Sequence, residues 1–144
     1  MNSNTFTILV ADDDQEDCQL IKDALQESRL LNPLEFVGDG EALLKKLNEA
    51  KELPGLILLD LNMPKKDGRE ALKEIKSDPR LKRIPVVILT TSGAEEDVYR
   101  SYNLGVNSFI SKPVKFSALV DVLRHVTHYW FEIVQLPSNE GHQD

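Results

Sequence analysis

The chain of 144 residues, 41% of them hydrophobic, fits one domain with a single core and leaves no room for a second domain of ordinary size. Its 24 acidic residues outnumber 17 basic ones, and the net charge of -7 argues against nucleic-acid binding as the main function. With one cysteine, no signal-peptide pattern and no apolar run long enough for a membrane helix, we expect a cytoplasmic protein without a membrane span.

Short runs of branched apolar residues recur along the chain and predict β-strands. In chain order these runs are 6–11, 34–37, 56–59, 84–89 and 109–110. They are nearly continuous rather than alternating, which is typical of parallel strands that are buried on both faces. The segments between them have apolar residues at helical spacing. The chain therefore predicts five strands that alternate with helices.

Acidic and hydroxyl residues mark the predicted helix starts. Asp14 opens an acidic first turn with Glu16 and Asp17. Asp67 with Glu70 and Ser92 with Glu95 have the spacing of capping boxes. The alternation of strands and helices favours an open parallel sheet that is covered on both faces. In such sheets the functional site lies at the carboxyl ends of the strands, where the strand order reverses.

Polar residues stand at these strand ends. They are Asp12 and Asp13 after the first strand, Asp60 after the third, Thr90 after the fourth and Lys112 shortly after the fifth. Each alone has an ordinary explanation, such as a helix start, a turn or a solvated loop charge. A cluster of all five has no such ordinary explanation, because carboxylates about 5 Å apart repel by roughly 3 kcal/mol at an effective dielectric near 20. The cluster therefore predicts a bound cation.

Magnesium is the expected cation, with Mn²⁺ as a possible substitute. Mg²⁺ prefers oxygen ligands and completes its shell with water and phosphate oxygens. Asp12 and Asp13 are predicted to hold it together with Asp60, and the backbone carbonyl of Asn62 can add a ligand. The sequence leaves open which residue of the acidic pair ligates directly.

Phosphoryl transfer is the chemistry that this set of residues favours. Asp60, alone after the central strand, is the predicted nucleophile toward phosphorus. Lys112 would offset charge on the phosphoryl oxygens, and Thr90 would hydrogen-bond the phosphoryl group.

The same residues resemble the response-regulator receiver family, from Ile8 to about Val126. The acidic pair, the turn 60–64 with Asp67-Gly68, the threonine and Lys112-Pro113 match in order, and the intervals of 30 and 22 residues between Asp60, Thr90 and Lys112 also fit. The resemblance implies a flavodoxin-like α/β fold of five parallel strands in the order 2-1-3-4-5. It also implies phosphotransfer from a sensor histidine kinase to a signalling protein that is not an enzyme.

The resemblance further implies a switch in which Phe109 turns inward when Thr90 shifts toward the phosphoryl group. A plain apolar strand residue is the alternative for Phe109. A narrower resemblance is to the standalone regulators of cyanobacterial and bacterial phytochromes, carried by 62–70, 77–81, 90–92, 95–97 and the aromatic residues 129–131. It implies a phytochrome kinase and no effector domain, so the output would be altered affinity for an unidentified downstream protein or a second copy.

Three other functions compete with this one. A phosphatase of the haloacid dehalogenase class normally has an acid two residues after its nucleophile, where this chain has Asn62. A flavin- or nucleotide-binding module would be repelled by the acidic turn after the first strand. An inactive receiver that only docks other proteins would more easily lack Asp60 or Lys112, and both are present.

The C-terminal segment predicts a homodimer interface. We expect the receiver domain over 5–128, with a helix extension and tail over 129–144 as part of it. The helical pattern runs from about Phe116 to Val134, longer than the sheet needs, and leaves apolar residues for a partner. The predicted interface residues are Val122, Val126, Tyr129, Trp130 and Ile133. A tail that folds back over its own domain is the alternative.

Overall fold

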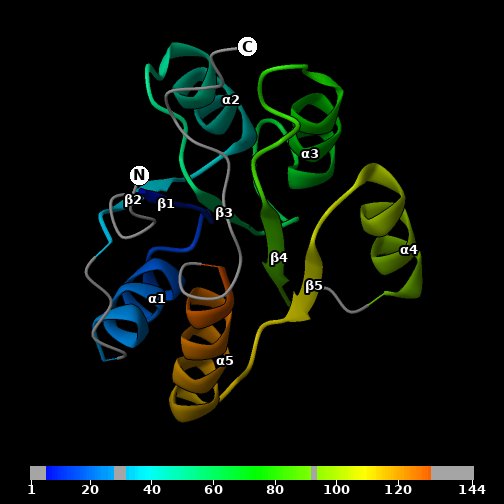
Figure 1. Ribbon diagram of the computed structural model, residues 1–144. Coiled ribbons are helices and arrows are strands. Elements are labelled where there is room, and N and C mark those ends of the chain that lie inside the picture. Colours follow the sequence, from blue (N-terminus) through cyan, green and yellow to red (C-terminus); the bar gives the residue numbers. More distant parts are fainter. Residues whose placement is uncertain (1–5, 28–31, 92–93, 131–144) are drawn as a thin grey trace.

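The computed structural model describes residues 6–27, 32–91 and 94–130, in which five strands alternate with five helices. The elements are β1 (Ile8–Ala11), α1 (Gln15–Glu27), β2 (Leu34–Val37), α2 (Gly40–Glu49), β3 (Leu56–Leu59), α3 (Gly68–Ser77), β4 (Val86–Thr90), α4 (Glu95–Leu104), β5 (Ser108–Ser111) and α5 (Phe116–His128). All strand pairs are parallel, and the order β2-β1-β3-β4-β5 confirms the predicted flavodoxin-like fold (Figure 1).

Two apolar layers enclose the sheet. Helices α1 and α5 lie side by side on one face, and α2, α3 and α4 cover the other (Figure 1). Every residue of β1, β3 and β4 is buried, as the continuous apolar runs predicted. The edge strands β2 and β5 are largely half-exposed, because each has a strand neighbour on one side and lies where the helix layers end. No helix in the described part of the chain could cross a bilayer.

The helix starts follow the predicted caps in two of three cases. Asp14 Oδ1 accepts hydrogen bonds from the first turn of α1, and Asp67 is the N-cap of α3. Helix α4 begins at Glu95 behind Ala94, which has no side chain able to cap. The predicted start at a Ser92 capping box is therefore wrong, and Ser92 itself lies outside the described residues.

The predicted dimer interface is partly taken up by the protein's own core. Val126 and Trp130 pack against the apolar layer between α5 and the sheet. Val122 is half-buried, and Tyr129 is 48% exposed. Ile133 and the predicted end of the helix lie outside the described residues. The face left for a partner is therefore narrower than expected.

Candidate functional site

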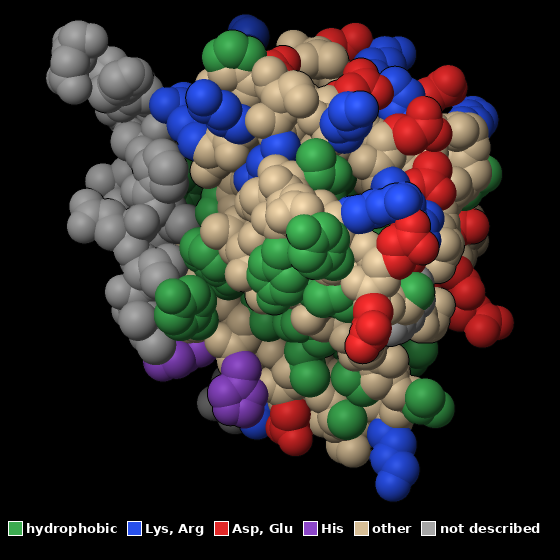
Figure 2. All heavy atoms as spheres, turned by 90° about the vertical axis from the view of Figure 1, so that its right-hand side faces the viewer, with side chains coloured by type: hydrophobic (Ala, Val, Ile, Leu, Met, Phe, Trp, Pro, Cys, Tyr) green, Lys and Arg blue, Asp and Glu red, His purple; other side chains and the backbone are tan. Residues whose placement is uncertain are grey.

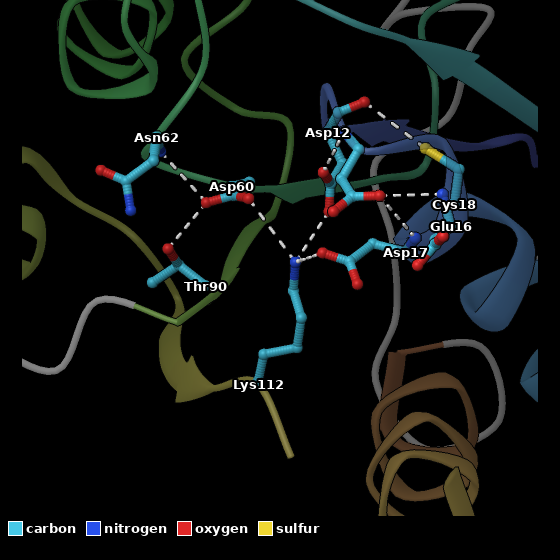
Figure 3. Close-up of polar contacts among 9 residues, drawn as sticks. Asp12, Glu16, Asp17, Cys18, Asp60, Asn62, Thr90 and Lys112 are labelled. Carbon is cyan, nitrogen blue, oxygen red and sulfur yellow. Dashed lines mark hydrogen bonds and ion pairs between the residues drawn. The ribbon is translucent and has the colours of Figure 1, made fainter. Parts of the chain in front are cut away.

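The five predicted strand-end residues meet at one edge of the sheet, and Figure 3 shows four of them, Asp12, Asp60, Thr90 and Lys112. Asp12 and Asp13 follow β1, Asp60 follows β3, Thr90 ends β4, and Lys112 follows β5. Parallel strands bring their carboxyl ends together, and the strand order reverses between the neighbours β1 and β3. The site therefore lies where the alternation of strands and helices predicted it.

Asp60 lies at the centre of the site and is 7% exposed. Its Oδ1 accepts a hydrogen bond from Thr90 Oγ1 at 2.7 Å and one from the Asn62 N–H at 3.1 Å. Its Oδ2 lies 3.5 Å from Lys112 Nζ. The loop that carries it is tightly packed, because a Cβ on Gly68 would fall 2.3 Å from the Asp60 carbonyl oxygen. Asp60 thus has little freedom of position.

Lys112 joins three elements through its ammonium group. Its Nζ lies 2.8 Å from Asp12 Oδ2 and 2.8 Å from Asp17 Oδ2, closer than to Asp60. Burial alone would lower the pKa of Lys112, but the hydrogen bonds to Asp12 and Asp17 outweigh it and hold the pKa above its ordinary value. The sequence reasoning missed Asp17. Its place in the first turn of a helix that starts at the site was the available signal, and we used it only as a helix-start marker.

The acidic pair divides into a buried and an exposed residue. Asp12 is 3% exposed, and its Oδ1 accepts the Asp14 N–H at 2.9 Å, whereas Asp13 is exposed. Burial raises the pKa of Asp12, and Lys112 offsets only part of this effect. Asp12, Asp13 and Asp60 each offer an oxygen, and these three atoms lie within 4.8 Å of one another. Three carboxylate oxygens at this spacing fit a hard divalent cation.

Asn62 lies beside these three carboxylates, and its N–H donates to Asp60. That its backbone carbonyl binds the metal stays a prediction. The donor set is otherwise all carboxylate, which favours Mg²⁺ or Mn²⁺ over metals that prefer sulfur or imidazole.

Residues 8–124 match the response regulator receiver domain family. The chain belongs to this family. The chain is 43% identical over 136 residues to the response regulator Rcp1 of Synechocystis sp., which covers 91% of this chain and 92% of that protein. It is also similar to the solved structure of the phosphorylated cyanobacterial phytochrome response regulator RcpA, with a TM-score of 0.88, 42% identity and coverage of 93% of this chain and 99% of that one. The Mn²⁺-bound form of Rcp1 gives a TM-score of 0.85, 42% identity and coverage of 92% and 99%.

The family assignment decides against two of the three competing functions, the phosphatase and the flavin- or nucleotide-binding module. Receivers take part in two-component signal transduction as phosphoryl acceptors, and the strand-end site of this chain fits that role. The phosphatase and flavin-binding readings lose their basis. The receiver is a signalling protein.

The two predicted switch residues of the receiver lie on neighbouring strands. Thr90 is fully buried and bonded to Asp60, while Phe109 is half-buried against the apolar layer under α2 and α3. The Phe109 N–H donates to Tyr102 Oη at 3.2 Å, so the outer side of β5 is joined to α4. This contact was not predicted. Movement of Thr90 and Phe109 stays a prediction.

Cys18 borders the site rather than the core of the receiver. It is half-buried, and its Sγ donates to the Asp12 carbonyl oxygen at 3.4 Å. Burial, followed by the charge of Asp12, raises the pKa of the thiol to about 11. The thiol is therefore a weak nucleophile at neutral pH.

Proposed function

We propose that Asp60 accepts a phosphoryl group from a phosphohistidine of a sensor histidine kinase, in a reaction that requires Mg²⁺. The observation that carries the proposal is the position of Asp60, whose two oxygens face Thr90 on one side and Lys112 on the other, beside the acidic pair. A nucleophile, a cation to offset charge and a hydroxyl donor are what phosphoryl transfer needs from a protein.

The transfer forms an Asp60 O–P bond and breaks the P–N bond to the histidine, whose imidazole leaves. Asp12, Asp13 and Asp60, with the Asn62 carbonyl, would hold Mg²⁺ or Mn²⁺, which when bound offsets negative charge on the phosphoryl oxygens. Lys112 supplies a second cation that is already 3.5 Å from Asp60. The Thr90 hydroxyl, which donates to Asp60 in the structure, would donate to the phosphoryl group instead.

The kinase partner proposed here is a phytochrome. One support is the similarity to RcpA, which is a cyanobacterial phytochrome response regulator. Another is the similarity to the bacteriophytochrome response regulator RtBRR, which is 37% identical to this chain with a TM-score of 0.74. Such a partnership places the protein in the cytoplasm with the kinase's catalytic part. The acyl phosphate would be lost slowly by self-catalysed hydrolysis, so the chain acts as a signal carrier rather than a turnover enzyme.

The signal is proposed to leave through the surface of α4, β5 and α5. Figure 2 looks onto this side and shows hydrophobic side chains gathered between charged ones. Tyr99, Tyr102, Val114 and Phe116 are exposed hydrophobic residues of these elements and the loop between β5 and α5. An unidentified downstream protein would bind there.

A homodimer through α5 and the segment after it remains part of the proposal. Tyr129 and Val122 would make the contact together with Ile133, while Val126 and Trp130 would contribute only their exposed edges. We also propose that the receiver domain spans 5–128 and that 129–144 extends it.

The direct test is chemical mapping of the acceptor. The protein is incubated with acetyl phosphate and Mg²⁺, digested and analysed by mass spectrometry. We expect one phosphoryl group on the peptide that contains Asp60, none in Asp60→Asn, and none when EDTA removes the metal. Asp78→Asn, a helix C-cap far from the site, is the matched control and should be labelled like the wild type. Equal labelling of Asp60→Asn and wild type would refute the assignment.

A further inference from the structure

The Lys112 ammonium does not lie closest to the residue on which the phosphoryl group would form. Its Nζ is 2.8 Å from Asp17 Oδ2 and 2.8 Å from Asp12 Oδ2, but 3.5 Å from Asp60 Oδ2 (Figure 3). An ammonium has three N–H donors. Two of them are therefore used in good hydrogen bonds away from Asp60, and the third makes a poor one.

The side chain of Lys112 has few other places to go. It is 7% exposed, and its backbone N–H donates to the Thr90 carbonyl oxygen at 2.7 Å, which holds the start of the side chain beside β4. The ammonium can therefore shift between its three carboxylate neighbours but cannot easily leave for solvent. Asp17 reaches it from the first turn of α1 and is 27% exposed.

The three neighbours differ in their other tasks. Asp12 belongs to the group of carboxylates that fits a cation, and Asp60 is the proposed acceptor. Asp17 belongs to neither set, and its carboxylate contacts Lys112. Once Asp12 is engaged with a cation, Asp17 is the carboxylate that remains to compete for the ammonium.

We propose that Asp17 is a positioning residue that draws the Lys112 ammonium toward α1, so that a phosphoryl group on Asp60 must compete with Asp17 for it. The inference rests on the proposed function of Asp60. Phosphorylation places anionic oxygens beside Lys112 that attract it more strongly than the Asp60 carboxylate does. The contact between α1 and β5 through Asp17 and Lys112 then weakens, and its loss opposes the phosphorylated state.

The competition can be measured with beryllofluoride, which mimics a phosphoryl group on a carboxylate without a covalent step. At saturating Mg²⁺, Asp17→Asn should bind beryllofluoride about threefold to tenfold more tightly than the wild type. Loss of one charge-assisted hydrogen bond from a partly exposed carboxylate such as Asp17 changes a binding constant by roughly threefold to tenfold. Asp17→Glu restores the charge and should return the affinity most of the way. Glu16→Gln removes the same charge from the same exposed turn and should change the affinity far less.

A spectroscopic readout reports on the Asp17–Lys112 pair without any phosphoryl chemistry. In ¹⁵N-labelled protein at low temperature and a mildly acidic pH at which the carboxylates stay ionised, an ammonium held by two carboxylates exchanges slowly enough to give a resolved signal, assigned by its absence in Lys112→Met. Asp17→Asn should shift this signal and speed its exchange with water, and Glu16→Gln should leave it in place. In the wild type, beryllofluoride should shift the signal further.

The outcomes separate this inference from the proposed function. If the wild type binds no beryllofluoride but Asp17→Asn shifts the ammonium signal, the function of Asp60 fails while the ion pair stands. If Asp17→Asn and Glu16→Gln raise the affinity equally, the effect is that of charge at a distance and the positioning role is refuted. It is also refuted if Asp17→Asn binds beryllofluoride more weakly, because Asp17 would then hold Lys112 in place for the phosphoryl group.

Discussion

Two clusters of charged side chains link elements of this receiver, and they are built differently. The strand-end cluster contains Asp12, Asp13, Asp17, Asp60 and Lys112. The α3–α4 clasp contains Arg69, Asp67 and Asp97, in which Arg69 Nε and Nη2 each lie 2.7 Å from a carboxylate oxygen of Asp97 and Nη1 lies 3.0 Å from Asp67. The first cluster has four carboxylates and one ammonium, which contacts three of them, and most of the cluster is buried. The second has two around one guanidinium, and its Arg69 is 36% exposed.

The difference indicates what each cluster is for. In the clasp, two oxygens of Asp97 accept hydrogen bonds from Arg69, and these bonds raise the pKa of Arg69. In the strand-end cluster four carboxylates outnumber one cation by three, against an excess of one in the more exposed clasp, and this larger excess costs stability unless another cation arrives. The clasp holds two helices together, whereas the strand-end cluster holds an excess of negative charge that a bound metal ion would offset.

The largest effect is expected from removing the one cation of the strand-end cluster. Lys112→Met keeps most of the length of the side chain but leaves the buried carboxylates without their ammonium partner, so we expect a loss of about 3 kcal/mol in the free energy of unfolding. Urea denaturation in EDTA measures it, and Mg²⁺ should restore part of the loss. Arg69→Met is the matched substitution in the clasp and should cost about 1 kcal/mol or less. Equal losses would remove the distinction between the two clusters.

A double-mutant cycle sharpens the description of the clasp. Arg69→Gln, Asp97→Asn and the double variant should give a coupling free energy of about 0.5 to 1 kcal/mol, because the pair is bidentate but partly exposed. Urea denaturation at low and high salt measures it, and the coupling should shrink as salt screens the charges. A coupling indistinguishable from zero at low salt would show that packing, rather than this ion pair, joins α3 to α4.

Sequence reasoning predicted the strand-end cluster better than the clasp, for a physical reason. Asp12, Asp60 and Lys112 each stand at the end of an apolar run, and parallel strands necessarily bring such ends together. The pairing of Arg69 with Asp97 depends on how two helices are rotated against each other, which local patterns do not determine. Local patterns likewise do not determine how α5 packs on the sheet, and this packing buries part of the predicted dimer interface in the protein's own core.

A smaller effect is expected at Cys18, which borders the strand-end cluster. Its pKa of about 11 lies above the ordinary 9.0, so the folded state favours the protonated thiol. This contribution to stability is present below about pH 9 and is lost as the pH rises from there through about 11. Alkylation by iodoacetamide at pH 8 to 10, followed by mass spectrometry, should be much slower than in urea-unfolded protein. Saturating Mg²⁺ should speed it, because the metal offsets the charge of Asp12. If Cys18 in the folded protein is alkylated as fast as in the unfolded chain, its half-buried environment and raised pKa are contradicted.

The claim that the strand-end cluster is a charge excess kept for a metal ion is tested most directly by the free energy of unfolding of wild type and Asp60→Asn, with and without Mg²⁺. Asparagine can still accept the hydrogen bonds from Thr90 and the Asn62 N–H through its side-chain oxygen. In EDTA we therefore expect Asp60→Asn to be about 1 kcal/mol more stable than the wild type, because one like charge is removed. With saturating Mg²⁺ the order should reverse, since binding stabilises the folded wild type more strongly. Two results together would contradict the account. They are an Asp60→Asn variant that is less stable than the wild type in EDTA, and a wild type whose free energy of unfolding does not change when Mg²⁺ is added.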